Sequence, residues 1–139
     1  MRWATLVAAA MTPAMRPLFM PTARQWNVLI PLGMSALGYA LYVRYMVIQE
    51  TKVGLACDAG LATWLCASRR LVIGLHEHSV FGWVALGAAV LNLMRPSLVL
   101  FAIGMVAAAL GVVLYNAGLA GLAAGLLILS FARPVIETV

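Results

Sequence analysis

Two cysteines, Cys57 and Cys66, are the side chains of this sequence best suited to redox chemistry. They are its only cysteines, and nine positions separate them. On one straight helix they would lie about 13 Å apart along the axis, which is too far for a disulfide. A helix break at 58–60 would bring them together. The pair therefore predicts a structural disulfide or two free apolar thiols, and the alternative is a redox pair that passes electrons to a membrane quinone.

A second polar group, His76, Glu77 and His78, lies at the edge of a long apolar segment. Histidines near a membrane surface can ligate haem or exchange protons with a quinol. Residues two apart on a helix point about 200° from each other, so these histidines cannot share a metal there, and we predict no metal site. We expect a polar cap at a helix start, with Glu77 near Arg69 or Arg70. The alternative is that His76 or His78 contributes to a quinone or haem site shared with another subunit.

The elements that must position these residues are strongly apolar. The sequence is 65% hydrophobic and 9% charged, whereas soluble domains carry about 25% charged residues. Residues 97–132 contain no charged side chain, and one membrane crossing needs about 20 apolar residues. This segment therefore predicts two antiparallel spans joined by a turn at 116–118. The net charge of +5 comes from arginines that flank apolar segments, which indicates a lipid bilayer rather than nucleic acid as the partner.

We expect an all-α, integral membrane four-helix bundle that forms a single transmembrane domain over 1–139. An N-terminal interfacial arm covers 1–26, where three prolines four residues apart prevent a continuous helix. The predicted spans are 27–48, 71–94, 97–115 and 118–132, and the second begins near either Leu71 or Val80. Arg44, close to the end of the first span, is expected to snorkel toward the interface.

The distribution of cations predicts how the bundle is oriented. Five arginines lie on the side that holds both termini, and three or four cations lie on the other side. The positive-inside rule then places both termini in the cytoplasm and the 49–70 connection on the periplasmic side of a bacterial inner membrane.

Small residues spaced three or four apart predict the faces on which helices pack closely. They are Gly33, Ala36 and Ala40 in the first span, Gly104 and Ala108 in the third, and Ala117, Gly121 and Gly125 in the fourth. We expect these faces to contact neighbouring helices of the same chain or of another subunit.

Four spans with a periplasmic cysteine region resemble the disulfide bond formation protein B family and the vitamin K epoxide reductase family. The resemblance covers span count and loop side, and it implies quinone-linked thiol oxidation through Cys57 and Cys66. The Cys-x-x-Cys pair of those families is not present, so no active-site role is carried over.

No nucleotide loop, zinc-protease motif or catalytic triad is present either. We therefore expect a non-catalytic accessory or structural subunit of a respiratory or photosynthetic membrane complex. Its partners are other membrane subunits, it has no cofactor of its own, and any quinone or haem lies at a shared interface.

Overall fold

The computed structural model describes residues 19–132, and this part of the chain is entirely helical, as the sequence predicted. It contains six α-helices and one π-helix, η1, which continues directly from α2. The elements are α2 (Ala23–Tyr42), η1 (Val43–Ile48), α3 (Thr51–Asp58), α4 (Trp64–Glu77), α5 (Val80–Met94), α6 (Leu98–Val113) and α7 (Ala117–Ser130).

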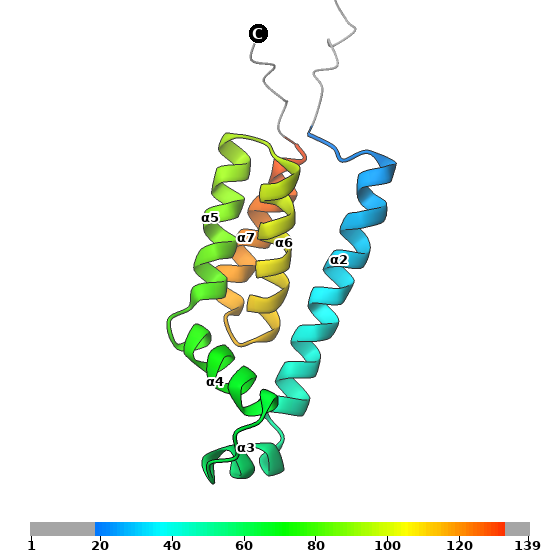
Figure 1. Cartoon of the computed structure of the whole chain (residues 1–139). Coiled ribbons are helices and arrows are strands. Elements are labelled where there is room, and N and C mark those ends of the chain that lie inside the picture. The colour runs from blue at the N-terminus through cyan, green and yellow to red at the C-terminus, as the bar shows by residue number, and fades with distance from the viewer. Residues whose placement is uncertain (1–18, 133–139) are drawn as a thin grey trace, which may run out of the picture.

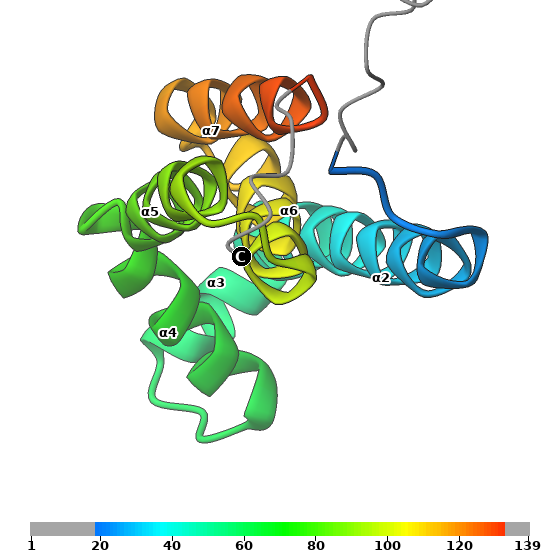
Figure 2. The same cartoon turned by 90° about the horizontal axis from the view of Figure 1, so that it is seen from above.

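Helices α5, α6 and α7 form a three-helix unit, and α2 leans against it (Figure 1). Each of the three helices packs on the other two, whereas α2 packs mainly on α6. Viewed from above, α2 extends away from α6 on the side opposite to α5 (Figure 2). The short helices α3 and α4 lie at the end of the molecule remote from the start of α2 and the end of α7 (Figure 1).

The interior of the α5–α7 unit consists mainly of alanine and glycine. Its buried residues are Gly82, Ala85, Ala88, Ala89 and Asn92 on α5, Phe101, Gly104, Ala107, Ala108, Gly111 and Val113 on α6, and Ala120, Ala123, Leu127 and Ser130 on α7. Large apolar side chains point outward instead: Trp83 is 62% exposed, Val99 65% and Ile128 68%. Soluble bundles bury such side chains, whereas helices packed in lipid place small residues at their contacts.

Only one helix of the described residues is by itself long and apolar enough to cross a membrane, the 26-residue Ala23–Ile48 segment. Helices α4 and α5 satisfy the same criterion only as a pair, which is bent by 60°. Helices α6 and α7 are apolar but contain 16 and 14 residues. Length and composition alone therefore do not establish the four-span bundle expected from the sequence.

The helix that contains the first predicted span begins at Ala23, four residues before the predicted start at residue 27. A reciprocal capping box explains this start. The backbone N–H of Gln25 donates to the side-chain oxygen of Thr22, and the backbone N–H of Thr22 donates to the side-chain oxygen of Gln25 at 2.8 Å. The last residues of the predicted interfacial arm are thus helical, and 1–18 lie outside the described residues.

Of the two starts predicted for the second apolar helix, the structure has the later one, because α5 begins at Val80 and the chain breaks between Glu77 and Val80. Ser79 adopts a left-handed backbone conformation with φ 53°, which a helix cannot continue through. The turn predicted at 116–118 lies earlier, since Tyr115 has φ 67° and α7 already begins at Ala117. In both places a non-glycine residue makes the turn, so no glycine or proline marked it in the sequence.

Candidate functional site

Cys57 and Cys66 form a disulfide that ties α3 to α4, with their Cα atoms 5.3 Å apart. The helix break that this bridge requires is present, because α3 ends at Asp58 and Gly60 turns the chain with φ 92°. Thr63 then caps α4 by accepting a hydrogen bond from the backbone N–H of Cys66. Both cysteines are more than 90% buried. A thiolate cannot readily attack sulfurs that are so covered, so the geometry favours a structural bridge over a redox pair.

An ion pair reinforces the same junction. Nη1 of Arg69 lies 3.6 Å from Oδ1 of Asp58, and the guanidinium also covers Gly54 of α3. The sequence placed Glu77 near Arg69 or Arg70, and this prediction is wrong. Glu77 is exposed at the far end of α4, and the described residues contain no ion pair that involves it.

Removing the bridge is expected to cost about 2–3 kcal/mol of unfolding free energy, the value for closing a loop of roughly ten residues. The reason is that the bridge restricts the unfolded chain, and in the folded chain α3 packs mainly on η1 and α4. The expected result for the Cys57→Ser/Cys66→Ser variant is a lower midpoint of thermal unfolding in detergent. Alkylation before and after reduction, read by mass spectrometry, reports the bridge in the unmodified protein. Two thiols that label without reductant would contradict this assignment.

A second polar cluster lies where η1 meets the turn between α6 and α7. Nη1 of Arg44 donates a hydrogen bond of 2.9 Å to the backbone carbonyl of Val113, the last residue of α6. The last carbonyls of a helix have no partner within it and carry a partial negative charge. The guanidinium also stacks over the ring of Tyr115, 4.3 Å from its centroid, and lies 5.6 Å from that of Tyr45. Arg44 therefore caps the C-terminal end of α6 with a side chain that is partly buried. The expectation that it snorkels toward the interface stays a prediction.

Tyr115 is the residue on which this cluster converges. Its hydroxyl accepts a hydrogen bond from the Gln49 side chain, and its ring meets the ring of His76 edge-on with the centroids 5.9 Å apart. Side chains from η1, from the residue after η1 and from α4 thus all contact the α6–α7 turn. The local widening of the helix at η1 is typical of functional or structurally constrained positions.

The histidines predicted as a helix-start cap lie instead at the end of α4. His76 packs on Tyr115, and Nδ1 of His78 donates to the carbonyl of Gly74 at 2.9 Å. Nδ1 of His76 and Nε of Arg44 are buried without a hydrogen-bond partner in residues 19–132. Within the same residues, no group of three or more His, Cys, Asp or Glu is placed to hold a metal. The cluster contains a cation and hydrogen-bond donors but pairs no nucleophile with a base, so its geometry suits fixing helix ends or holding a ligand better than covalent catalysis.

The predicted small-residue faces divide into two groups. Gly33 and Ala36 are partly covered and Ala40 is fully buried; a Cβ at Gly33 would lie 3.4 Å from Sδ of Met105 on α6. Gly104 and Ala108 are also buried. Ala117, Gly121 and Gly125 face outward, and a Cβ at either glycine would meet nothing within 4 Å. Helix α7 packs inward through Ala120, Ala123 and Leu127 instead, so its predicted face is open.

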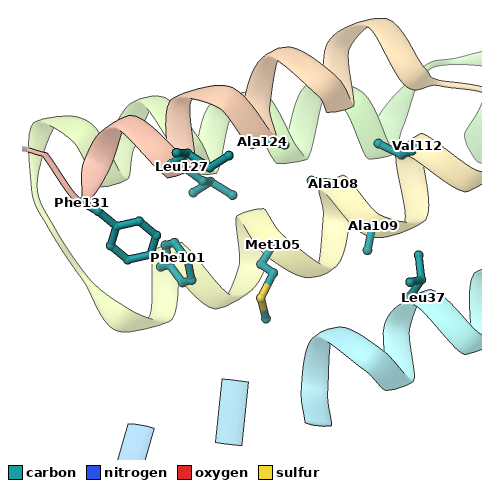
Figure 3. Close-up of a pocket in the computed structure, with 10 residues that line it drawn as sticks. Leu37, Phe101, Met105, Ala108, Ala109, Val112, Ala124, Leu127 and Phe131 are labelled. Carbon is teal, nitrogen blue, oxygen red and sulfur yellow. The ribbon is translucent and has the colours of Figure 1, made fainter. Parts of the chain in front are cut away.

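Apolar grooves border α2 because it packs mainly on one helix of the unit, α6. The first, of about 370 Å³, runs between α2, α6 and α7. Figure 3 shows Phe101 and Phe131 side by side in it, with Leu37 of α2 across from Ala109 of α6. A second groove of about 430 Å³ lies between α2, α5 and α6. The lining of both is almost wholly apolar, so neither offers groups that could bind a polar substrate.

Comparison with known proteins adds no family to this geometry: no family model, curated protein or solved structure matches the chain. The assignment of function therefore depends on the distribution of side chains and on the two polar clusters described above.

Proposed function

We propose that this chain is a small integral membrane protein that acts as a non-catalytic accessory subunit of a larger membrane complex. Its four spans are α2 with η1, α5, α6 and α7, while α4 lies in the interface and α3 outside the bilayer. The observation that carries this proposal is the outward orientation of the large apolar side chains around an interior of alanine and glycine. In water, an exposed apolar surface of this extent would aggregate.

Aromatic residues at the α3–α4 end support this placement. Tyr42, Tyr45 and Trp64 are exposed at the α3–α4 end, as expected of an interfacial belt.

Helices α5, α6 and α7 are only about 21–24 Å long, against a hydrocarbon thickness of about 30 Å. Local thinning of the bilayer, or burial of flanking residues, accommodates spans that are this short.

The proposed orientation has both termini in the cytoplasm of a bacterial cell. It follows from counting cations near the spans, which gives Arg2, Arg16, Arg24, Arg95 and Arg133 on one side and Lys52, Arg69 and Arg70 on the other. Arg44 is left out of this count of cations on the two sides, because its guanidinium caps α6.

The role as a subunit is supported by the open face of α7. Ala117, Gly121 and Gly125 form an outward strip without Cβ-sized obstacles, and such strips let a second helix backbone approach closely. The proposed partner is a helix of another membrane subunit, in a respiratory or photosynthetic complex. A quinone or haem held at that interface would belong to the assembled complex.

Lysine substitutions test the membrane placement. Met34 is 65% exposed in the middle of the Ala23–Ile48 segment, and Val90 is 42% exposed on α5. In a bilayer, each lysine is expected to cost about 2.5 kcal/mol and to lower the amount of protein in carbonate-washed membranes. On a water-exposed surface, the same changes cost less than about 0.5 kcal/mol. Leu61→Lys, 54% exposed in the α3–α4 loop, is the matched control and should have no effect. Met34→Lys protein that stays stable in detergent-free buffer would refute the proposal.

Bulky substitutions on α7 test the docking face. Gly121→Leu combined with Gly125→Leu is expected to abolish co-purification of partner subunits from native membranes, because the two backbones can no longer approach. Gly87→Leu is the control, since Gly87 is also exposed with nothing near its Cβ, but lies on α5. Neither variant should have a lower unfolding midpoint than the parent chain. Partner recovery that is unchanged in the α7 variant would exclude this face as the interface.

A further inference from the structure

One groove beside α2 differs from the other two because a cation lies at its end. It has a volume of about 310 Å³ and runs between the first halves of α2 and α6. Its apolar lining consists of Val28, Leu29, Leu32, Leu98, Val99 and Ala102, and Arg24 and Gln25 complete it. Arg24 and Gln25 belong to the first turn of α2, so the polar end of this groove is at the surface of the bundle.

The charge of Arg24 is not used by the described part of the protein. The ion pair between Arg69 and Asp58 is the only one within residues 19–132, and Arg24 is not part of it. Every acidic residue of this part of the chain lies between Glu50 and Glu77, at the opposite end of the molecule. The Gln25 side chain already accepts the hydrogen bond of the α2 cap. Within the described residues, Arg24 and Arg95 are the cations at this end that form no ion pair, and of these two only Arg24 lines the groove.

We propose that this groove binds one anionic phospholipid, with the phosphate at Arg24 and an acyl chain along α2 and α6. The inference rests on the membrane placement proposed above. From Arg24 to Leu32 the groove follows α2 for about 12 Å, a distance that an extended acyl chain below the headgroup would fill. The starts of α2 and α6 lie at the same end, and their unpaired N–H groups add to the positive potential there. The two wholly apolar grooves accept lipid chains without selecting the headgroup.

The test is native mass spectrometry of the full chain, released from mixed vesicles of equal phosphatidylglycerol and phosphatidylcholine. One retained phosphatidylglycerol is expected, with a roughly fivefold preference over phosphatidylcholine, the ratio that one arginine near a headgroup provides. Arg24→Gln is expected to remove the preference. Val99→Phe, at an exposed position that lines this groove, is expected to reduce retention of both lipids while leaving Arg24 in place. Arg70→Gln, an exposed cation at the other end, should retain the preference.

Three results would overturn the inference. If Arg24→Gln keeps the preference for phosphatidylglycerol, Arg24 is excluded as the headgroup ligand. If Arg70→Gln loses this preference to the same extent as Arg24→Gln, the preference comes from the overall positive charge of the protein and not from this groove. If the full chain retains no lipid, the groove does not bind a phospholipid, and its occupant would be either residues 1–18 or a partner helix. Each of these leaves the membrane placement standing. If the chain does not sediment with carbonate-washed membranes, the proposed function fails first, and this inference fails with it.

Discussion

Gly82→Leu is expected to destabilise the α5–α7 unit by about 3 kcal/mol or more, enough to prevent folding of a marginally stable chain. A Cβ at this position would lie 2.7 Å from Cβ of Leu119 and 2.8 Å from Nδ2 of Asn116. A neighbouring Cβ is fixed to its backbone and cannot rotate away, so α5 and α7 would have to separate. Gly111 is equally confined, because its Cβ would lie 2.8 Å from Cβ of Ala120.

The matched control is Gly87→Leu, on the same helix as Gly82 but with open space at the Cβ position. Leucine has a higher helix propensity than glycine, so the control should be neutral or more stable by up to about 1 kcal/mol. Thermal unfolding in detergent, followed by circular dichroism, measures both variants. Equal midpoints for Gly82→Leu and Gly87→Leu would mean that α5 and α7 are not in contact as described.

These glycines show what a four-residue spacing can and cannot predict. The spacing correctly placed Gly104 and Ala108 on one buried face, but it also selected Gly121 and Gly125, which point outward. In a soluble helix, polar residues on the opposite side identify the exposed face. Helices α6 and α7 are apolar all round, so the sequence offers no such sign. Spacing then shows which residues share a face, while packing of the whole unit decides which face is buried.

The helical character of the chain was predictable, since long apolar segments allow few alternatives once the chain is placed in lipid. The sequence left two starts for the second span, Leu71 and Val80, and it could not decide between them, because Ser79 adopts its left-handed conformation without a glycine or proline signal. The cluster around Tyr115 was also missed. Arg44 and Val113 are 69 positions apart, and no local pattern connects residues at that distance. The available clue was an aromatic residue next to Asn116 in the turn of an uncharged hairpin.

Arg44→Ala is expected to cost about 3 kcal/mol of unfolding free energy, because it removes a charged hydrogen bond and a cation–π contact together. The Val113 carbonyl would lose its donor at the end of α6, and the ring of Tyr115 would lose the guanidinium 4.3 Å away. Arg44→Lys keeps the charge but not the planar group that stacks on the ring, so it should recover only part of the loss. Arg70→Ala, an exposed cation on α4, is the control and should change stability by less than about 0.5 kcal/mol.

A double-mutant cycle separates the stacking on Tyr115 from the cap on α6. Arg44→Ala and Tyr115→Ala are expected to be coupled by about 1–2 kcal/mol, because each removes the partner of the other. Tyr115→Gly should be less destabilising than Tyr115→Ala, because glycine adopts φ 67° without the cost that a Cβ brings, about 1 kcal/mol. Coupling near zero would mean that Arg44 acts on α6 alone. If the Tyr115→Ala variant were more stable than the Tyr115→Gly variant, the left-handed turn would be contradicted. The geometry that brings η1, α4 and the α6–α7 turn together would then be contradicted as well.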